Sequence, residues 1–142
     1  NLSDLAEYYH AKAQTGGDRQ DYREAAGWYR KFLAYFPDEP DSANTNFLLA
    51  EILFESEDYE AATQEYERTS YAYPFHDKSA EAGYAAILAY REHEQSLSGA
   101  ARAEWHQAYL DSGLKFADTY PEHPEAGAVL TALGAVRAAS RA

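Results

Sequence analysis

Cysteine and methionine are both absent from the 142 residues of this chain. Without cysteine the chain can form no disulfide, no thiolate metal site and no cysteine nucleophile. No apolar run approaches the roughly 18 residues that a membrane-spanning helix needs, and the longest one, 126–136, is interrupted by Thr131. We therefore expect no direct membrane insertion. Because the chain opens at Asn1 and lacks methionine, we also expect an excerpt or processed form of a longer protein.

Basic residues are scarce. The chain has 12 Lys and Arg against 24 Asp and Glu, and its formal net charge is −12. Ten acids and no Lys or Arg lie within residues 38–67. Such a surface repels phosphate backbones, so we predict that nucleic acid is not a partner. Many of these acids are expected on solvated helix faces, where they favour solubility.

Motifs for catalysis and for cofactors are missing as well. The five histidines show no i, i+4 pair and no other metal-ligand pattern. Gly16 and Gly17 are not followed by the Lys-Ser/Thr of a phosphate-binding loop. Carboxylate pairs such as Glu55 and Asp58 have no predicted pocket for acid–base chemistry. We therefore predict that the chain is not an enzyme and that it holds no metal and no cofactor.

The sequence does contain a motif that occurs three times. Each copy is a helical pattern that ends in an aromatic residue followed by proline. The copies end at Pro37, Pro74 and Pro121, which stand 37 and 47 residues apart. This repetition predicts stacked helical hairpins, each of which buries its apolar face against its neighbours. The 46% of apolar residues are sufficient for one continuous core in a single domain.

Caps, breakers and the 3.6-residue period predict seven helices and no strands. We expect Asp4 and Glu7 to form a capping box in the first helix, Asp77 to cap the fifth, and Pro124 to stand in the first turn of the seventh. The expected helices span 3–14, 19–36, 41–55, 58–73, 77–94, the segment between Gly99 and Pro121, and a last segment from 124 onwards.

The fourth helical segment resembles the second helix of a tetratricopeptide repeat, with Ala62 and Tyr66 on its core face and Pro74 at its end. Leu49, Ala50 and Leu53 match the first helix of such a repeat. Neighbouring copies match at Tyr22, Ala25, Tyr29, Phe32 and Pro37, and at Leu130, Leu133 and Gly134.

The resemblance covers nearly the whole chain and implies an all-α, right-handed α-α superhelix of about 3.5 helical hairpins. It implies one domain over 1–142, with repeats at 3–37, 41–74 and 77–121 and a partial repeat at 124–142.

The same resemblance implies a non-enzymatic scaffold for protein–protein interaction, in which the first helices line a concave groove. Some family members bind acidic tails through basic groove residues, but here Glu51 and Glu81 stand at such positions. We therefore expect a peptide or helix with basic and apolar residues as the partner. The groove residues carried over by position are His10, Asn44, Phe47, Glu51, Phe54, Glu55, Glu81, Tyr84 and Leu88.

Two further surfaces are predicted. Trp28 and Tyr35 lie two turns apart, away from the core stripe of the second helix, and form a possible secondary binding surface. Val129 and Val136 are expected on an exposed apolar face of the last helix, which makes a homo-oligomer possible. A self-association or spacer module is accordingly one alternative function.

The linkers carry a narrower resemblance. Those after Pro37, Pro74 and Pro121 resemble the long turns of bacterial envelope proteins of this class, namely the lipoprotein of the outer-membrane assembly machine and the Tol-associated periplasmic protein. This implies a scaffold in the periplasm or cell envelope, with a cytoplasmic location left open. An accessory domain of a cell-envelope enzyme, with its catalytic part elsewhere, is the other alternative.

Overall fold

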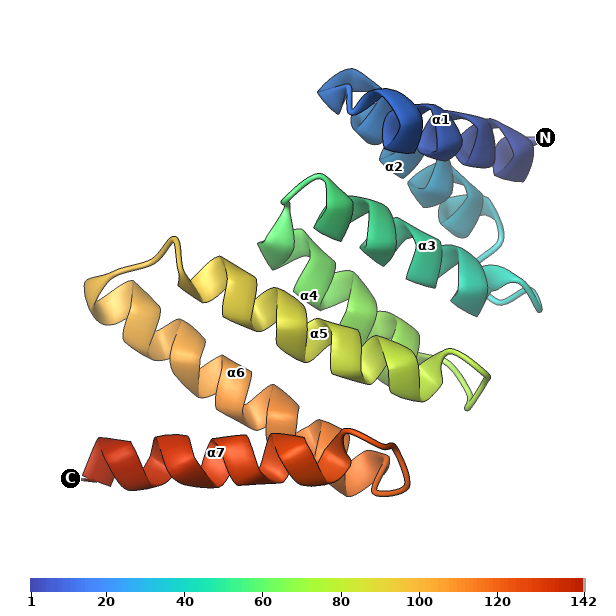
Figure 1. Cartoon of the computed structure of the whole chain (residues 1–142). Helices are drawn as coiled ribbons and strands as arrows, with labels where there is room; N and C mark the ends of the chain where they lie inside the picture. The colour runs from blue at the N-terminus through green and yellow to red at the C-terminus, as the bar shows by residue number, and fades with distance from the viewer. Residues whose placement is uncertain (142) are drawn as a thin grey trace.

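The computed structural model describes the backbone of residues 1–141 and the side chains of residues 1–134. Over this part of the chain it has seven α-helices and no strand, which confirms the predicted all-α class (Figure 1). The elements are α1 (Leu2–Gly16), α2 (Arg19–Tyr35), α3 (Ser42–Glu55), α4 (Tyr59–Glu67), a π-helical turn η1 (Arg68–Ala72), α5 (Ser79–Glu94), α6 (Gly99–Thr119) and α7 (Ala126–Arg141).

Two of the predicted helix caps were wrong. The capping box of α1 joins Asn1 to Asp4 instead of Asp4 to Glu7, and the Asn1 side chain accepts the Asp4 N–H at 3.0 Å. Lys78 stands at the N-cap of α5, so Asp77 is not its cap. In both places the helix boundary lies one or two residues from the predicted one.

The last helix also differs from its prediction. It begins at Ala126, so Pro124 lies in the preceding turn and not in the first turn of the helix. Val129 is only 8% exposed and belongs to the core, whereas Leu130 is 48% exposed. Val129 is therefore not part of an exposed apolar face, and Val136 lies outside the residues whose side chains are described.

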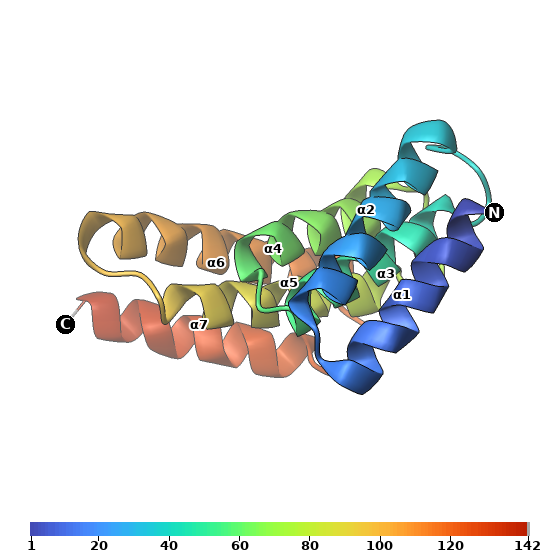
Figure 2. The same cartoon turned by 90° about the horizontal axis from the view of Figure 1, so that it is seen from above.

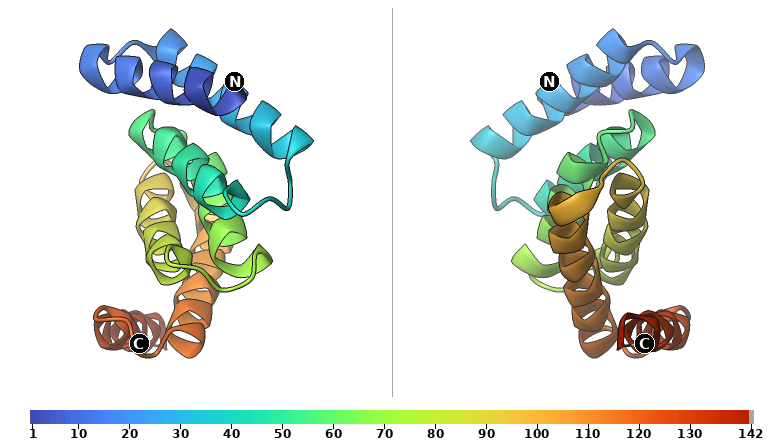
Figure 3. Two further views of the ribbon diagram at one scale, coloured as in Figure 1. Left: turned by 90° about the vertical axis from the view of Figure 1, so that its right-hand side faces the viewer. Right: turned by 90° about the vertical axis from the view of Figure 1, so that its left-hand side faces the viewer.

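The helices are arranged in the order of the chain. Substantial packing joins α1 to α2, α3 to α4 and α5 to α6 as hairpins, while α2 with α3, α4 with α5 and α6 with α7 connect successive units. Figure 1 shows the three hairpins following one another down the molecule to α7. Figure 2 shows α1 and α2 in front of the stack, and Figure 3 shows them at the end opposite α7. Stability is therefore expected to depend on contacts between neighbours.

Small residues allow the helices of the first core cluster to approach closely. Ala25, Ala50 and Ala62 are 0% exposed. Tyr29 and Tyr66, four residues after Ala25 and Ala62, are 1% exposed and fill the adjoining space. This arrangement confirms the core stripe that the helical period predicts for α2 and α4. A second cluster, centred on Phe116, joins α5, α6 and α7.

The turns between hairpins repeat the same contact 37 residues apart. The hydroxyl of Ser42 accepts the N–H of Glu39, and the hydroxyl of Ser79 accepts the N–H of His76, each at 2.9 Å. Both serines are 0% exposed. Each satisfies a backbone donor of the turn that precedes the helix, so the repetition in the sequence has a structural counterpart.

The predicted helix at 58–73 is interrupted by the π turn η1. Polar groups of this turn bond to side chains from other parts of the chain. The Asn46 amide donates to the Thr69 hydroxyl, and the Tyr120 hydroxyl donates to the Ser70 carbonyl, both at 2.8 Å. His76 Nε2 lies 2.8 Å from the carbonyl of Thr69. The π turn thus ties α3, α5 and the end of α6 together.

Among the described residues, no helix combines the length and apolar character that a membrane span needs.

Candidate functional site

The middle of the predicted groove is closed by internal packing. Phe47 is 5% exposed, its ring lies 6.0 Å from that of Tyr66, and the ammonium of Lys78 stands 5.3 Å from its ring centre. Phe54 is half-buried, with its ring 5.1 Å from that of Tyr59. Phe47 is therefore closed to a partner, contrary to the prediction, while Phe54 keeps part of its surface exposed.

Glu51 is also engaged within the fold. Its carboxylate accepts the hydroxyl of Tyr66 at 2.5 Å. Burial, followed by this hydrogen bond to Glu51, raises the pKa of the Tyr66 hydroxyl well above its ordinary value. One oxygen of the half-buried Glu51 carboxylate thus satisfies a buried hydroxyl.

His10 and Glu55 take part in hydrogen bonds that join three helices. His10, on α1, is 8% exposed, and its Nδ1 lies 2.9 Å from the hydroxyl of Tyr29 on α2. Its Nε2 lies 3.1 Å from the Glu55 carboxylate at the end of α3, which also accepts the Gln14 amide at 2.9 Å. Burial, then the charges of Glu7 and Glu55, raises the pKa of the Tyr29 hydroxyl.

Replacing Glu55 with alanine is therefore expected to destabilise the first two hairpins. The change removes the partner of His10 and Gln14 and should lower the free energy of unfolding by about 1 kcal/mol. Urea denaturation followed by circular dichroism measures this difference. Glu104→Ala, at an exposed position of α6, is the control. Equal effects of the two substitutions would contradict this role for Glu55.

The remaining predicted positions on α3 and α5 differ in their surroundings. Asn44 and Glu81 are exposed, and Glu81 pairs with Lys78 at 3.3 Å. Tyr84 and Leu88 are half-buried and lie together on the wall of a hollow of about 240 Å³ between α5, α6 and α7. Of these four positions, the structure brings Tyr84 and Leu88 together in one hollow.

This hollow, called the α5–α7 hollow below, is mainly apolar. Two rings pack against Tyr84 and hold it in place. The ring of Phe116 lies 5.9 Å from the Tyr84 ring, and that of His123 is stacked on it at 5.6 Å. Arg91 and Glu125 are the charged side chains of the lining. The full lining is Tyr84, Ile87, Leu88, Arg91, Tyr109, Glu125, Ala128, Val129 and Ala132. Its chemistry suits an apolar side chain with polar groups at its edge.

Trp28 and Tyr35, the predicted secondary surface, differ in their surroundings. Trp28 is half-buried against the first core cluster, and its indole N–H is buried without a hydrogen-bond partner among the described residues. Lys31 stands 5.1 Å from its ring centre. Tyr35 is 69% exposed near the end of α2, next to the ring of Phe36.

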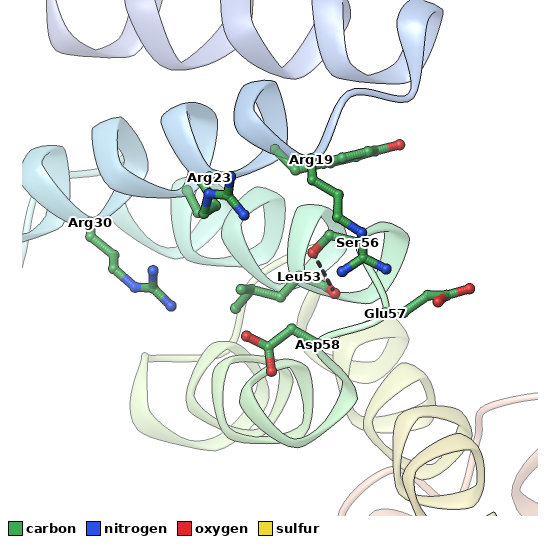
Figure 4. Close-up of a pocket in the computed structure, with 9 residues that line it drawn as sticks. Arg19, Arg23, Arg30, Leu53, Ser56, Glu57 and Asp58 are labelled. Carbon is green, nitrogen blue, oxygen red and sulfur yellow. Dashed lines mark hydrogen bonds between the residues drawn. The ribbon is translucent and has the colours of Figure 1, made fainter. Parts of the chain in front are cut away.

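A second hollow was missed at the sequence level. It has a volume of about 630 Å³ and lies between α2 and the turn from α3 to α4 (Figure 4). Arg19, Arg23 and Arg30 line it from α2, with Glu57 and Asp58 from the turn. The i, i+4, i+11 spacing places the three arginines on one face of a helix, and this pattern could have indicated the hollow from the sequence.

No group of three or more His, Asp or Glu side chains in the described part of the chain is arranged to hold a metal ion. Comparison with known proteins finds no family model and no curated protein that matches this chain. The candidate sites are therefore the two hollows and the side chains that line them.

Proposed function

We propose that this chain is a non-enzymatic interaction module of the tetratricopeptide type, which binds a segment of a partner protein in the α5–α7 hollow. The observation that carries the proposal is the position of this hollow, on the helix face where Tyr84 and Leu88 are the predicted groove residues. Sequential hairpin packing and the serine contacts repeated at Ser42 and Ser79 support a superhelical repeat array.

The partner segment carries an apolar anchor and basic residues. The anchor enters between Leu88 and Val129, where burial of its apolar surface holds the complex. The net charge of −12 attracts a basic segment at long range, and Glu125 on the lining accepts a basic group near the anchor. We place the module in a bacterial envelope complex on the resemblance of its linkers.

Self-association is the second candidate function, because both end helices expose apolar side chains. Tyr8 on α1 is 60% exposed, and Leu130 on α7 is 48% exposed. Sedimentation equilibrium at increasing protein concentration distinguishes this role, since self-association depends on concentration and partner binding does not require it.

Leu88→Glu is expected to weaken partner binding at least about tenfold, because it places a charge against the apolar lining. Peptides selected from a displayed random library on the intact chain supply the probe, and isothermal titration calorimetry measures their affinity. Selected peptides should be rich in apolar and basic residues, and their binding should weaken with salt.

Ala103→Glu is the matched control, because it adds the same charge at an exposed site on α6. Circular dichroism confirms that both variants keep their helices. Peptides that bind Leu88→Glu as tightly as the original chain would place the binding site elsewhere.

A further inference from the structure

The hollow between α2 and the α3–α4 turn concentrates positive charge in an acidic protein. Arg19, Arg23 and Arg30 stand on one face of α2 and carry three of the chain's 12 basic side chains. Figure 4 shows the side chains of Arg19 and Arg30 extending from α2 toward the turn and α4. We call this hollow the arginine notch, with these three residues as one wall and Glu57 and Asp58 as the other.

None of the three guanidinium groups belongs to an ion pair in the part of the chain that the structure describes. The Lys and Arg side chains in ion pairs there are Lys12, Arg68, Lys78 and Arg102. Arg23 donates to the uncharged amide oxygen of Gln20, at 2.9 Å from Nη2. The three guanidinium groups therefore have no carboxylate at the contact distance at which they bind one well. The charge of Arg30 acts only at longer range, on Glu65, whose carboxyl pKa is raised by burial and lowered in part by Arg68 and Arg30.

The facing wall is fixed in place by its backbone. Glu57 has φ 64°, in the left-handed region that side-chain-bearing residues seldom adopt. The Glu57 N–H donates to the Phe54 carbonyl at 3.0 Å, and the Asp58 N–H donates to the Leu53 carbonyl at 2.8 Å. These bonds hold two exposed acidic residues at the rim of the notch, on the turn that lies opposite α2 (Figure 4).

The two walls do not close on each other, because core residues set their separation. Ala26 and Leu53 line the notch and are 5% and 4% exposed, and Tyr22 packs against the same core cluster. Side chains of opposite charge thus line two sides of a hollow of about 630 Å³. That volume lies within the range of ligand-binding pockets.

We propose that the arginine notch docks a segment of a partner protein in which acidic and basic side chains stand side by side. Its carboxylates pair with Arg19, Arg23 and Arg30, and its ammonium or guanidinium groups pair with Glu57 and Asp58. A purely anionic ligand would meet repulsion from the two carboxylates, so mixed charge complements both walls. The notch shares no residue with the α5–α7 hollow, and the inference does not depend on binding there.

The test uses the intact chain and three synthetic peptides of equal length, one alternating Glu and Lys, one all Glu and one all Lys. The alternating peptide is expected to bind most tightly, and its binding should weaken with salt. Arg30→Gln should weaken it roughly fivefold, as for the loss of a good ion pair. Lys31→Gln, the next residue on α2 but outside the notch, should change it less than about twofold.

Each alternative outcome overturns the proposal. If the all-Glu peptide or inorganic phosphate binds at least as tightly as the alternating peptide, the notch is an anion site only. Equal losses of peptide affinity in Arg30→Gln and Lys31→Gln would indicate attraction by overall charge. If the alternating peptide does not bind at all, the notch has no docking role. Binding that Leu88→Glu abolishes would assign the peptide to the α5–α7 hollow instead.

Discussion

Replacing Phe116 with alanine is expected to lower the free energy of unfolding by about 3–5 kcal/mol. The side chain is 0% exposed, and its ring lies 5.1 Å from that of His123 and 6.0 Å from that of Tyr120. Truncation would leave a cavity where α5, α6 and α7 meet, and it would remove the ring that supports Tyr84 beneath the α5–α7 hollow. Partner binding in that hollow should therefore be lost along with stability.

Phe75→Ala is the matched control, because Phe75 is 81% exposed and its loss should change stability by less than about 0.5 kcal/mol. Urea denaturation measures both variants. Hydrogen exchange should show faster opening of α5, α6 and α7 in Phe116→Ala, with α1 and α2 less affected, because packing connects chain neighbours. Uniform loss of protection through all the helices would contradict this modular behaviour.

Much of the architecture could be predicted because its determinants are local. Pro37, Pro74 and Pro121 fall just after helical segments or their π-helical continuation, and the alanines and tyrosines that follow the helical period are buried. The interruption at η1 could not be predicted in this way. It depends on Asn46 and Tyr120, whose side chains reach the π turn from 23 and 50 residues away.

The groove was harder to predict because exposure depends on neighbouring hairpins. Phe47 has the spacing of a groove residue, yet Tyr66 and Lys78 cover it. Tyr84 has the same role in the repeat pattern but lies beside a hollow that α7 leaves open. The periodicity identified the helix face, while the angle at which the next helix packs decides what remains accessible.

Charge counting along the chain had a similar limit. The acidic segment 38–67 contains no Lys or Arg, but its side chains meet groups from other elements. Glu55 meets His10, which is 45 residues away in the chain, and Glu57 and Asp58 face the arginines of α2. Some acids of this segment therefore have partners that counting along the chain does not show, and Glu51 and Glu55, which were predicted in the groove, also bond within the fold.

Raising the pH above about 10 is expected to unfold this protein steeply, because several buried tyrosines resist ionisation. Burial is the main cause that raises the pKa of Tyr29, Tyr66, Tyr71 and Tyr90. Hydrogen bonds to Glu51 and Glu67 raise the pKa of Tyr66 and Tyr90 further, since an ionised phenol would face a carboxylate.

The direction follows from proton binding. Above the ordinary tyrosine pKa of about 10, the unfolded chain loses these protons while the folded chain keeps them, so alkali favours unfolding. Their contribution to stability is fully present below that pH and is lost as the pH rises. Each such tyrosine adds a slope of about 1.4 kcal/mol per pH unit, so four together approach about 5 kcal/mol per unit.

Urea denaturation at a series of alkaline pH values measures this slope, and tyrosinate absorbance reports ionisation directly. Tyr66→Phe removes one titrating group and should reduce the slope by about 1.4 kcal/mol per pH unit, even though losing the bond to Glu51 lowers stability at neutral pH. Tyr35→Phe, at a side chain 69% exposed, should leave the slope unchanged. Stability that stays constant to pH about 11 would show that the folded state lets these hydroxyls ionise freely, for instance by local opening of the hairpins.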